Sequence, residues 1–375
     1  NNALYLLLGY ASLPWRGANV FPDFAMAFGG VLLVLALIPA LRRPDGENAG
    51  LALLVEGVAA ATLGWMCRWH GTHASLVLGI EAGLLLLASA WARTAARGTA
   101  LLILGHVCAT LAFAMAWYPF FDAASWDGPA VPLLMAALLA VVGVGTHLVF
   151  RLRNAADAAT AVGSGYLVSL AFLLYLSWVH QCVAEENRFW VLVASGAALF
   201  AVQFVRPLRF VNALCAVAWG LAAAAFFSGL GDAGRLTWAN GLALAGFLAL
   251  SQAARRIEAP FMSFEGRALW ISAGAAMAWD FVGEKLHAVC LGFSPTLAWA
   301  LLGGAFFACG LAARERIARW WGLGLLAAAL GRVAVVDAWD LGTLSRIFTF
   351  LGLGAILLVL GFVYNRYQET MKKWL

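Results

Sequence analysis

The feature that most constrains this chain is a run of about 20 apolar residues that recurs along its length, each time followed by a short loop. An α-helix rises about 1.5 Å per residue, so about 20 residues cross the roughly 30 Å hydrocarbon core of a bilayer. The 375 residues are 63% hydrophobic and only 11% charged, which is too apolar for a soluble globular protein. The sequence therefore predicts an all-α, polytopic transmembrane helix bundle.

We expect 13 spans, or 14 if the short apolar stretch 1–13 is counted. The expected spans are 20–41, 47–68, 75–93, 98–118, 129–150, 156–179, 188–206, 209–229, 237–254, 264–285, 294–313, 319–338 and 344–365. We treat 1–375 as a single transmembrane domain. Because the chain begins with Asn1-Asn2 and not with Met, we expect it to be the C-terminal part of a longer protein.

The basic residues indicate how the chain is oriented, because Lys and Arg concentrate in cytoplasmic loops. With the spans above, 17 of the 24 basic residues fall on one side of the membrane: Arg42, Arg43, Arg93, Arg97, Arg151, Arg153, Arg206, Arg209, Arg255, Arg256, Arg267, Arg314, Arg316, Arg319, Arg366, Lys372 and Lys373. This bias predicts a bacterial inner-membrane protein with a cytoplasmic C-terminus. It also accounts for the net charge of +5, so no nucleic-acid partner is implied.

A weak internal repeat is visible in the spacing of three arginines. Arg97, Arg209 and Arg319 each lie in a short cytoplasmic turn between two expected spans. A parallel repeat of four helices, near 75–153, 188–256 and 294–366, would explain this spacing. Regular spacing in any protein with many spans is the alternative explanation.

The expected hairpin 320–367 carries charged residues beside two apolar runs. Arg332 lies inside the first run, and Asp337, Asp340 and Arg346 lie in or near the connection. A charge within the hydrocarbon core costs roughly 2.5–3.5 kcal/mol on insertion scales, so Arg332 needs a partner. We predict that Asp337 or Asp340 contacts Arg332 or Arg346 at the outer edge of the membrane.

The same region resembles a known family. The sequence has a Trp-rich helix, an Arg-rich turn (Arg314, Arg316, Arg319), a Val-x-Asp ending, the segment RIFTFLGLG and a terminal Tyr-x-Arg. These motifs, over about the last 75 residues, are similar to the end of a large family of predicted bacterial inner-membrane proteins, domain of unknown function 2339. The segment 79–82 (GIEA) is similar to a family helix that often reads W-x-x-E-A. The chain departs from the family pattern at Arg332 (usually Lys), Ser345 (usually aromatic) and Asn365 (usually Gln). The resemblance implies a membrane architecture and no activity.

Three ionisable residues fall near the middle of expected spans: Glu56, Glu81 and His106. Such residues usually face a cavity or one another, so they are candidates for a proton or cation relay. The alternative is a neutral Glu that is hydrogen-bonded to His or to backbone and locks neighbouring helices together.

The distribution of tryptophan is the second feature that indicates a possible functional site. Of the 17 Trp residues, 11 fall near the outer ends of the expected spans. This excess predicts an outer groove for a sugar or a lipid headgroup. The candidates to line it are Trp69, Trp117, Trp126, Trp178 and Trp339. The alternative is that these residues only anchor the helices at the interface.

Motifs for catalysis or cofactor binding are absent from the sequence: it contains no P-loop, G-x-S-x-G or H-E-x-x-H. His70 and His73 form an H-x-x-H pair, but no second ligand pair accompanies them, and we predict no metal and no cofactor. A disulfide among Cys67, Cys182 and Cys290 is possible, but its pairing is not predicted.

The sequence favours a non-catalytic bundle that binds or moves an envelope amphiphile, either a lipid or a glycolipid, or that scaffolds a partner. The expected partners are membrane lipids and another membrane or periplasmic protein. Two alternatives stay open. One is a proton- or ion-coupled transporter that uses Glu81, Glu56 and His106. The other is a membrane-embedded enzyme for a lipid-linked substrate, with an outer histidine as its base.

Overall fold

The structure is a computed structural model that describes residues 20–36, 47–69, 72–92, 94–120, 128–153, 158–205, 209–229, 236–253, 264–289, 295–333, 335, 347, 350–359 and 361–362. Nearly all of these residues are helical, and the described part of the chain contains no strand. The predicted all-α fold is therefore confirmed.

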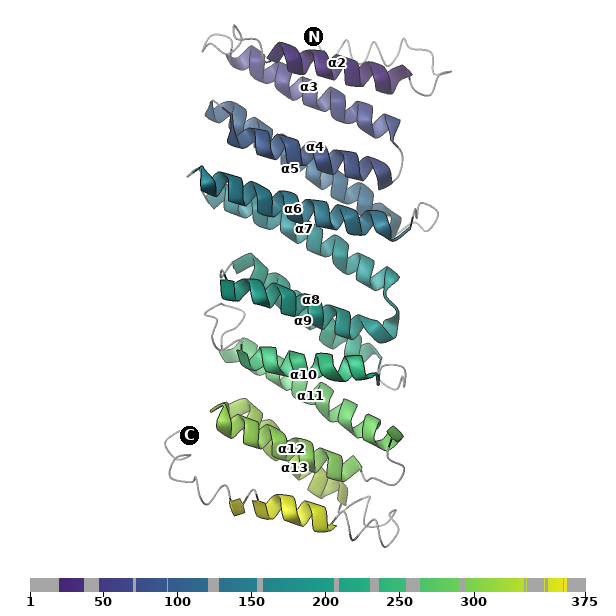
Figure 1. The fold of residues 1–375 in the computed structure, drawn as a ribbon, viewed down its shortest axis with the longest axis vertical. Coiled ribbons are helices and arrows are strands. Elements are labelled where there is room, and N and C mark those ends of the chain that lie inside the picture. The colour runs from purple at the N-terminus through teal and green to yellow at the C-terminus, as the bar shows by residue number, and fades with distance from the viewer. Residues whose placement is uncertain are drawn as a thin grey trace. The chain divides into compact units, whose positions relative to one another are not determined.

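The described helices follow the predicted spans closely (Figure 1). They are α2 (Val20–Ala36), α3 (Glu47–Arg68), α4 (Thr72–Ala90), α5 (Ala95–Trp117), the 3-10 turn η3 (Tyr118–Phe120), α6 (Ala130–Leu152), α7 (Ala158–Cys182), α8 (Glu185–Val205), α9 (Arg209–Ser228), α10 (Trp238–Ala253), α11 (Phe264–Val289), α12 (Pro295–Ala312) and α13 (Arg316–Arg332). Each expected span from 20–41 to 319–338 overlaps one of them. The last expected span, 344–365, overlaps a shorter apolar helix, Phe350–Val359.

Seven described helices are both long and apolar enough to cross a bilayer: α3, α4, α5, α6, α7, α9 and α12. Helix α11 has 26 residues, but five of them are charged: Glu265, Arg267, Asp280, Glu284 and Lys285. Helices α10 and α13 have 16 and 17 residues. The chain is thus a polytopic membrane protein in which one long helix is unusually rich in charge.

The chain divides after Val183 into two compact units. In unit 1, α2 pairs with α3, α4 with α5, and α6 with α7, while α4 also packs on α6 and α5 on α7. In unit 2, α8 pairs with α9 and α12 with α13, while α8 packs on α10 and α11 packs on both α10 and α13. Helical hairpins are the building block of each unit. Arg97, Arg209 and Arg319 fall in the first turns of α5, α9 and α13, and the four-helix repeat stays a prediction.

Glycine allows α12 and α13 to pack with their backbones in close contact. A Cβ atom added to Gly322 would lie 2.6 Å from the Phe307 backbone nitrogen and 2.7 Å from the Gly303 carbonyl oxygen. Lipid supplies no hydrophobic drive between helices, so close packing must hold them together. The small residues in this hairpin therefore stabilise it directly.

Unit 2 has an aromatic core. Trp219 on α9 is completely buried, and its ring lies 5.7 Å from those of Phe200 and Trp270 and 5.4 Å from that of Phe247. Gly196 on α8 makes room for it, because a Cβ there would lie 2.4 Å from the indole. Four helices, α8 to α11, are joined through this one side chain.

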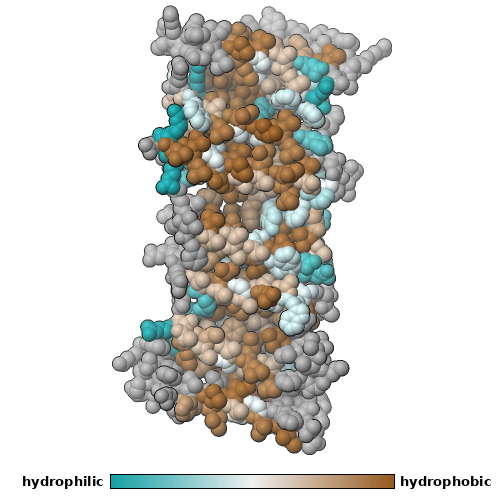
Figure 2. Space-filling view, viewed as in Figure 1, coloured by the Kyte–Doolittle hydropathy of each residue, from teal (hydrophilic) through white to brown (hydrophobic). Residues whose placement is uncertain are grey.

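The outer faces of the helices are apolar, as lipid contact requires. Leu84, Val141 and Leu242 are 64%, 68% and 75% exposed although each lies within a helix. Figure 2 shows apolar side chains over the helices and hydrophilic ones mainly near helix ends. Exposed apolar surface of this extent is unfavourable in water, and it is what a lipid-facing surface needs.

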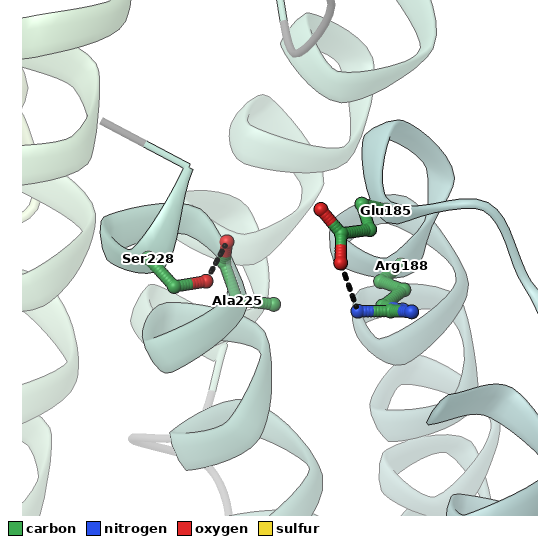
Figure 3. A network of polar contacts seen from close by, with 4 residues as sticks. All are labelled: Glu185, Arg188, Ala225 and Ser228. Atoms are coloured by element: carbon green, nitrogen blue, oxygen red, sulfur yellow. Dashed lines mark hydrogen bonds and ion pairs between the residues drawn. The ribbon is translucent and has the colours of Figure 1, made fainter. Parts of the chain in front are cut away.

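Two ion pairs in unit 2 differ in burial. Glu315, in the turn between α12 and α13, is 4% exposed and lies 3.8 Å from the Arg267 guanidinium on α11. In contrast, Glu185 and Arg188 pair at 3.2 Å in the first turn of α8, with the Glu185 side chain 84% exposed (Figure 3). The more buried pair joins α11 to the turn between α12 and α13, and the exposed one lies within a single helix.

We predict that Gly322→Ala weakens the α12–α13 hairpin, because the added methyl group would meet backbone atoms that cannot move aside. The expected loss of stability is about 1–3 kcal/mol, measured by thermal unfolding in detergent. Gly324→Ala is the matched control, since a Cβ at Gly324 meets nothing within 4 Å. Equal melting temperatures for the two variants would contradict the close packing.

We also predict that Glu315→Ala destabilises the protein by up to about 3–5 kcal/mol, because it leaves the Arg267 guanidinium, on a side chain only 17% exposed, without its carboxylate. Glu185→Ala should cost at most about 1 kcal/mol, since exposed pairs contribute little. Unfolding of both variants in the same detergent provides the comparison. If Glu185→Ala is the more damaging change, the Arg267–Glu315 contact does not stabilise unit 2.

Candidate functional site

The strongest candidate site is a pocket of about 540 Å³ in unit 2. It is lined from four helices by Phe227 on α9, by Ala276, Trp279, Asp280, Gly283 and Glu284 on α11, by Pro295 and Trp299 on α12, and by Arg332 on α13. The α11 residues are spaced three and four apart, so they share one face of that helix. A single helix face therefore brings two carboxylates and one indole into the pocket.

Two tryptophans and an arginine define the geometry of this pocket. The Arg332 guanidinium carbon lies 5.1 Å from the centre of the Trp299 ring, in a cation–π contact. The Trp279 ring meets Trp299 edge to face at 5.2 Å and 77°. Both indole N–H groups are buried, and neither has a hydrogen-bond partner among the described residues. The wall of the pocket therefore contains two buried indole N–H donors without a partner among the described residues.

Arg332 is the last residue of α13, where its positive charge also interacts favourably with the helix dipole. The sequence predicted a carboxylate near it, at Asp337 or Asp340. Those two residues and Arg346 lie outside the described residues, so that pairing stays a prediction. The described structure instead places Arg332 in the same pocket as Asp280 and Glu284.

This arrangement combines the three kinds of group that recognise a hydroxylated headgroup. The indole N–H groups and the guanidinium donate hydrogen bonds, the carboxylates accept them, and aromatic rings offer apolar contact to a sugar face. The volume is within the range of ligand pockets, roughly 300–1,000 Å³. Binding, and not bond cleavage, is what this set of groups most directly supports.

Sequence reasoning missed Asp280 and Glu284 as site residues. The signal was present, because both carboxylates interrupt the apolar span 264–285 and lie four residues apart beside Trp279. An ionisable residue within a span is a functional candidate by default. Trp299 could not be chosen from sequence, since nothing in its own span distinguishes it from the other outer tryptophans.

Glu81 joins three helices in unit 1. The Thr62 hydroxyl on α3 lies 2.9 Å from Glu81 Oε1 on α4, and Cys108 Sγ on α5 lies 3.8 Å from the same hydroxyl. The second carboxyl oxygen, Oε2, is buried and has no hydrogen-bond partner among the described residues. Glu81 thus lies at a three-helix junction.

The number of protons at this junction favours a neutral Glu81. The Thr62 hydroxyl also lies 2.8 Å from the Val58 carbonyl oxygen, which can only accept. One hydroxyl proton cannot serve two acceptors. Both contacts are hydrogen bonds if Thr62 donates to Val58 and a protonated Glu81 donates to Thr62.

His106 lies on another face of α5 and points toward α7. Its Nδ1 is 2.7 Å from the Leu102 carbonyl oxygen, and a Cβ at Gly163 on α7 would lie 2.6 Å from its Nε2. Glu56 is half-buried on α3, nearly two turns before Thr62. The contacts of Glu81 and His106 described above involve different neighbours. The predicted relay of Glu56, Glu81 and His106 stays a prediction.

The described candidate tryptophans of unit 1 each have their own contacts. Trp69 is 43% exposed at the end of α3, the Trp117 indole donates to the Ser177 hydroxyl at 2.8 Å, and Trp178 stacks on Tyr175. Trp126 and Trp339 lie outside the described residues. Among the described residues, the tryptophans that line the pocket of unit 2 are Trp279 and Trp299, which were not among the five candidates.

Among the described residues, we find neither a disulfide nor a cluster of possible metal ligands. Cys67 and Cys182 are free, and Cys290 lies outside the described residues. No group of three or more His, Cys, Asp or Glu side chains that could hold a metal ion occurs among the described residues.

Comparison with known protein families identifies the chain. The family of predicted membrane proteins DUF2339 matches residues 117–367, which is most of the sequence and includes the whole unit 2 pocket. The chain belongs to this family. The match extends far upstream of the last 75 residues that carried the resemblance, but it begins after Glu81 and His106. Comparisons with curated proteins and with solved structures returned no match.

We predict that Glu81→Gln leaves the stability of the protein within about 1 kcal/mol of the original, because glutamine keeps the shape and a donor for Thr62. Glu81→Ala should cost about 2–4 kcal/mol, since it removes the hydrogen bond and leaves a cavity. Thermal unfolding in detergent compares the two variants. A large loss in Glu81→Gln would indicate that the ionised carboxylate is needed for packing.

Proposed function

We propose that this DUF2339 protein is a non-catalytic membrane bundle that binds an envelope amphiphile through a hydroxyl-rich headgroup, such as that of a glycolipid. The pocket formed by Trp279, Asp280, Glu284, Trp299 and Arg332 carries the proposal. The protein either moves the bound lipid or presents it to another membrane or periplasmic protein.

The paired donors and acceptors favour a sugar over a simple phosphate. Phosphate oxygens accept hydrogen bonds and would suit Arg332 and the indole N–H groups, but Asp280 and Glu284 would repel their negative charge. A sugar hydroxyl both donates and accepts, so it can form hydrogen bonds with the carboxylates and with the indoles. The Trp279–Trp299 pair adds an apolar wall for the ring.

We further propose a bacterial inner-membrane location with a cytoplasmic C-terminus. The 17 of 24 basic residues predicted on one side support this orientation. Arg332, at the end of α13, would then lie near the outer surface, together with Glu284 and Pro295. A headgroup in the pocket would face the outer leaflet, where envelope glycolipids are exposed.

The test is lipid binding by the protein in nanodiscs, followed by native mass spectrometry with monoglucosyl-diacylglycerol and, as the comparison lipid, diacylglycerol with the same acyl chains. We expect the glucosyl lipid to bind in preference. Trp279→Phe and Trp299→Phe each keep a ring but remove an N–H donor, so each should weaken binding by about threefold to tenfold. Gly283→Ala should weaken it too, because the new Cβ would lie 2.8 Å from the Trp299 Nε1 atom.

Gly246→Ala is the control, because a Cβ at Gly246 meets nothing within 4 Å. It should bind the glucosyl lipid as the original protein does. Equal retention of both lipids, or unchanged binding in all three pocket variants, would refute the headgroup proposal.

An ion-coupled transporter is the second candidate, and one observation favours it. Glu81 Oε2 is buried at mid-helix without a hydrogen-bond partner among the described residues, as a proton-carrying group would be. If Glu81 carries the proton, Glu81→Gln should abolish pH-dependent flux in proteoliposomes while the protein stays folded. Unchanged flux would leave Glu81 with a packing role alone.

A further inference from the structure

A second groove lies in unit 1, on the membrane-facing side of α5 and α7, and it has no part in the function proposed above. Its volume is about 920 Å³, and it runs along α5 from Leu102 to Leu111 and along α7 from Val162 to Tyr166. Its walls are apolar apart from three polar side chains, His106, Thr110 and Tyr166. The hydrogen bonds of these three residues determine what the groove can bind.

The imidazole of His106 has a hydrogen-bond acceptor, Nε2, at the groove. Its Nδ1 lies 2.7 Å from the Leu102 carbonyl oxygen, and a carbonyl can only accept, so Nδ1 carries the proton. In the neutral ring, Nε2 is then an acceptor. Nε2 is buried and has no hydrogen-bond partner among the described residues.

The hydroxyls of Thr110 and Tyr166 follow the same reasoning. The Thr110 hydroxyl donates to the His106 carbonyl oxygen at 2.7 Å, so its one proton is used. Its 2.9 Å contact with the Tyr166 hydroxyl is therefore donated by Tyr166. After these bonds, Thr110 and Tyr166 also have only lone pairs left. The polar side of the groove accepts hydrogen bonds and donates none.

The depth of the site restricts the ligand further. Helix α5 has 23 residues, and His106 is at its middle, so Nε2 lies near the centre of the span. Phospholipid headgroups stay at the interface, about 15 Å away in a core that is roughly 30 Å thick. Phosphates and carboxylates are also excluded as ligands by their hydrogen bonding, because their oxygens can only accept hydrogen bonds and the groove offers no donor.

We propose that this groove binds a neutral lipid alcohol, of the isoprenoid or long-chain type, whose hydroxyl donates to His106 Nε2. The hydrocarbon chain lies along Ile103, Val107 and Val162, and the hydroxyl satisfies the buried nitrogen. Gly163 lets the imidazole lie against α7 at the edge of the groove, since a Cβ there would lie 2.6 Å from Nε2 and would push the ring aside. The ligand's only polar group is then satisfied at mid-membrane.

The test uses photo-crosslinking of the protein in nanodiscs with a farnesol analogue that carries a diazirine, against the methyl ether of the same analogue. The ether keeps the chain and the oxygen but cannot donate. We expect the alcohol to label peptides of α5 and α7 about fivefold more than the ether, which corresponds to one lost hydrogen bond. Mass spectrometry of the labelled peptides measures the ratio.

Two variants locate the site. His106→Phe keeps a ring of similar shape and should reduce the alcohol-to-ether ratio to about 1, because the acceptor is gone. Gly163→Ala should lower labelling by the alcohol, while Gly145→Ala in the same unit should not, since a Cβ at Gly145 meets nothing within 4 Å. Thermal unfolding of each variant shows that it is folded.

Equal labelling of the original protein by alcohol and ether would overturn the proposal without recourse to any variant. So would an alcohol preference that persists in both His106→Phe and Gly163→Ala. Because the glycolipid pocket lies on α9 and α11 to α13, its variants test the proposed function independently. Each proposal can therefore fail while the other holds.

Discussion

The structure depends on the need of neighbouring helices to approach closely in a medium that does not drive them together. Each α-helix satisfies its own backbone hydrogen bonds in lipid, but lipid tails are as apolar as the side chains they touch. Association therefore rests on packing, and it is closest where glycine removes the side chain. At Gly303 and Gly322 the backbones of α12 and α13 are in direct contact, and this fixes where Arg332, at the end of α13, enters the pocket.

Sequence reasoning located the helices well because apolar length is a strong signal in a membrane protein. The span 98–118, for example, corresponds to α5 (Ala95–Trp117). The candidate site was harder to predict, because the partner of Arg332 was sought nearby in the chain, at Asp337 or Asp340. In the folded protein the residues beside it come from α11 and α12, about 30 to 50 positions earlier. Hydropathy predicts where each helix begins and ends. It carries no information about which helix packs against which, or through which face.

Charge within α11 is the clearest link between structure and function in unit 2. Asp280 and Glu284 lower the hydropathy of α11, a helix of 26 residues that is long enough to cross the membrane. A helix that only had to pack would gain stability from apolar residues at both positions. Their presence on the same helix face as Trp279 and Gly283, together with the pocket beside them, favours a ligand that uses the carboxylates.

The two candidate sites differ in whether they can donate hydrogen bonds to a ligand or only accept them. This difference follows from the side chains alone. The unit 2 pocket offers both donors and acceptors, because it combines indoles and a guanidinium with carboxylates. The groove in unit 1 offers acceptors only, because Leu102 and the His106 carbonyl already use the protons of His106 and Thr110. A headgroup with many hydroxyls suits the first site, and a lipid with a single hydroxyl suits the second. One lipid could not satisfy both sites equally well, so two ligand classes are the simplest consequence of the geometry.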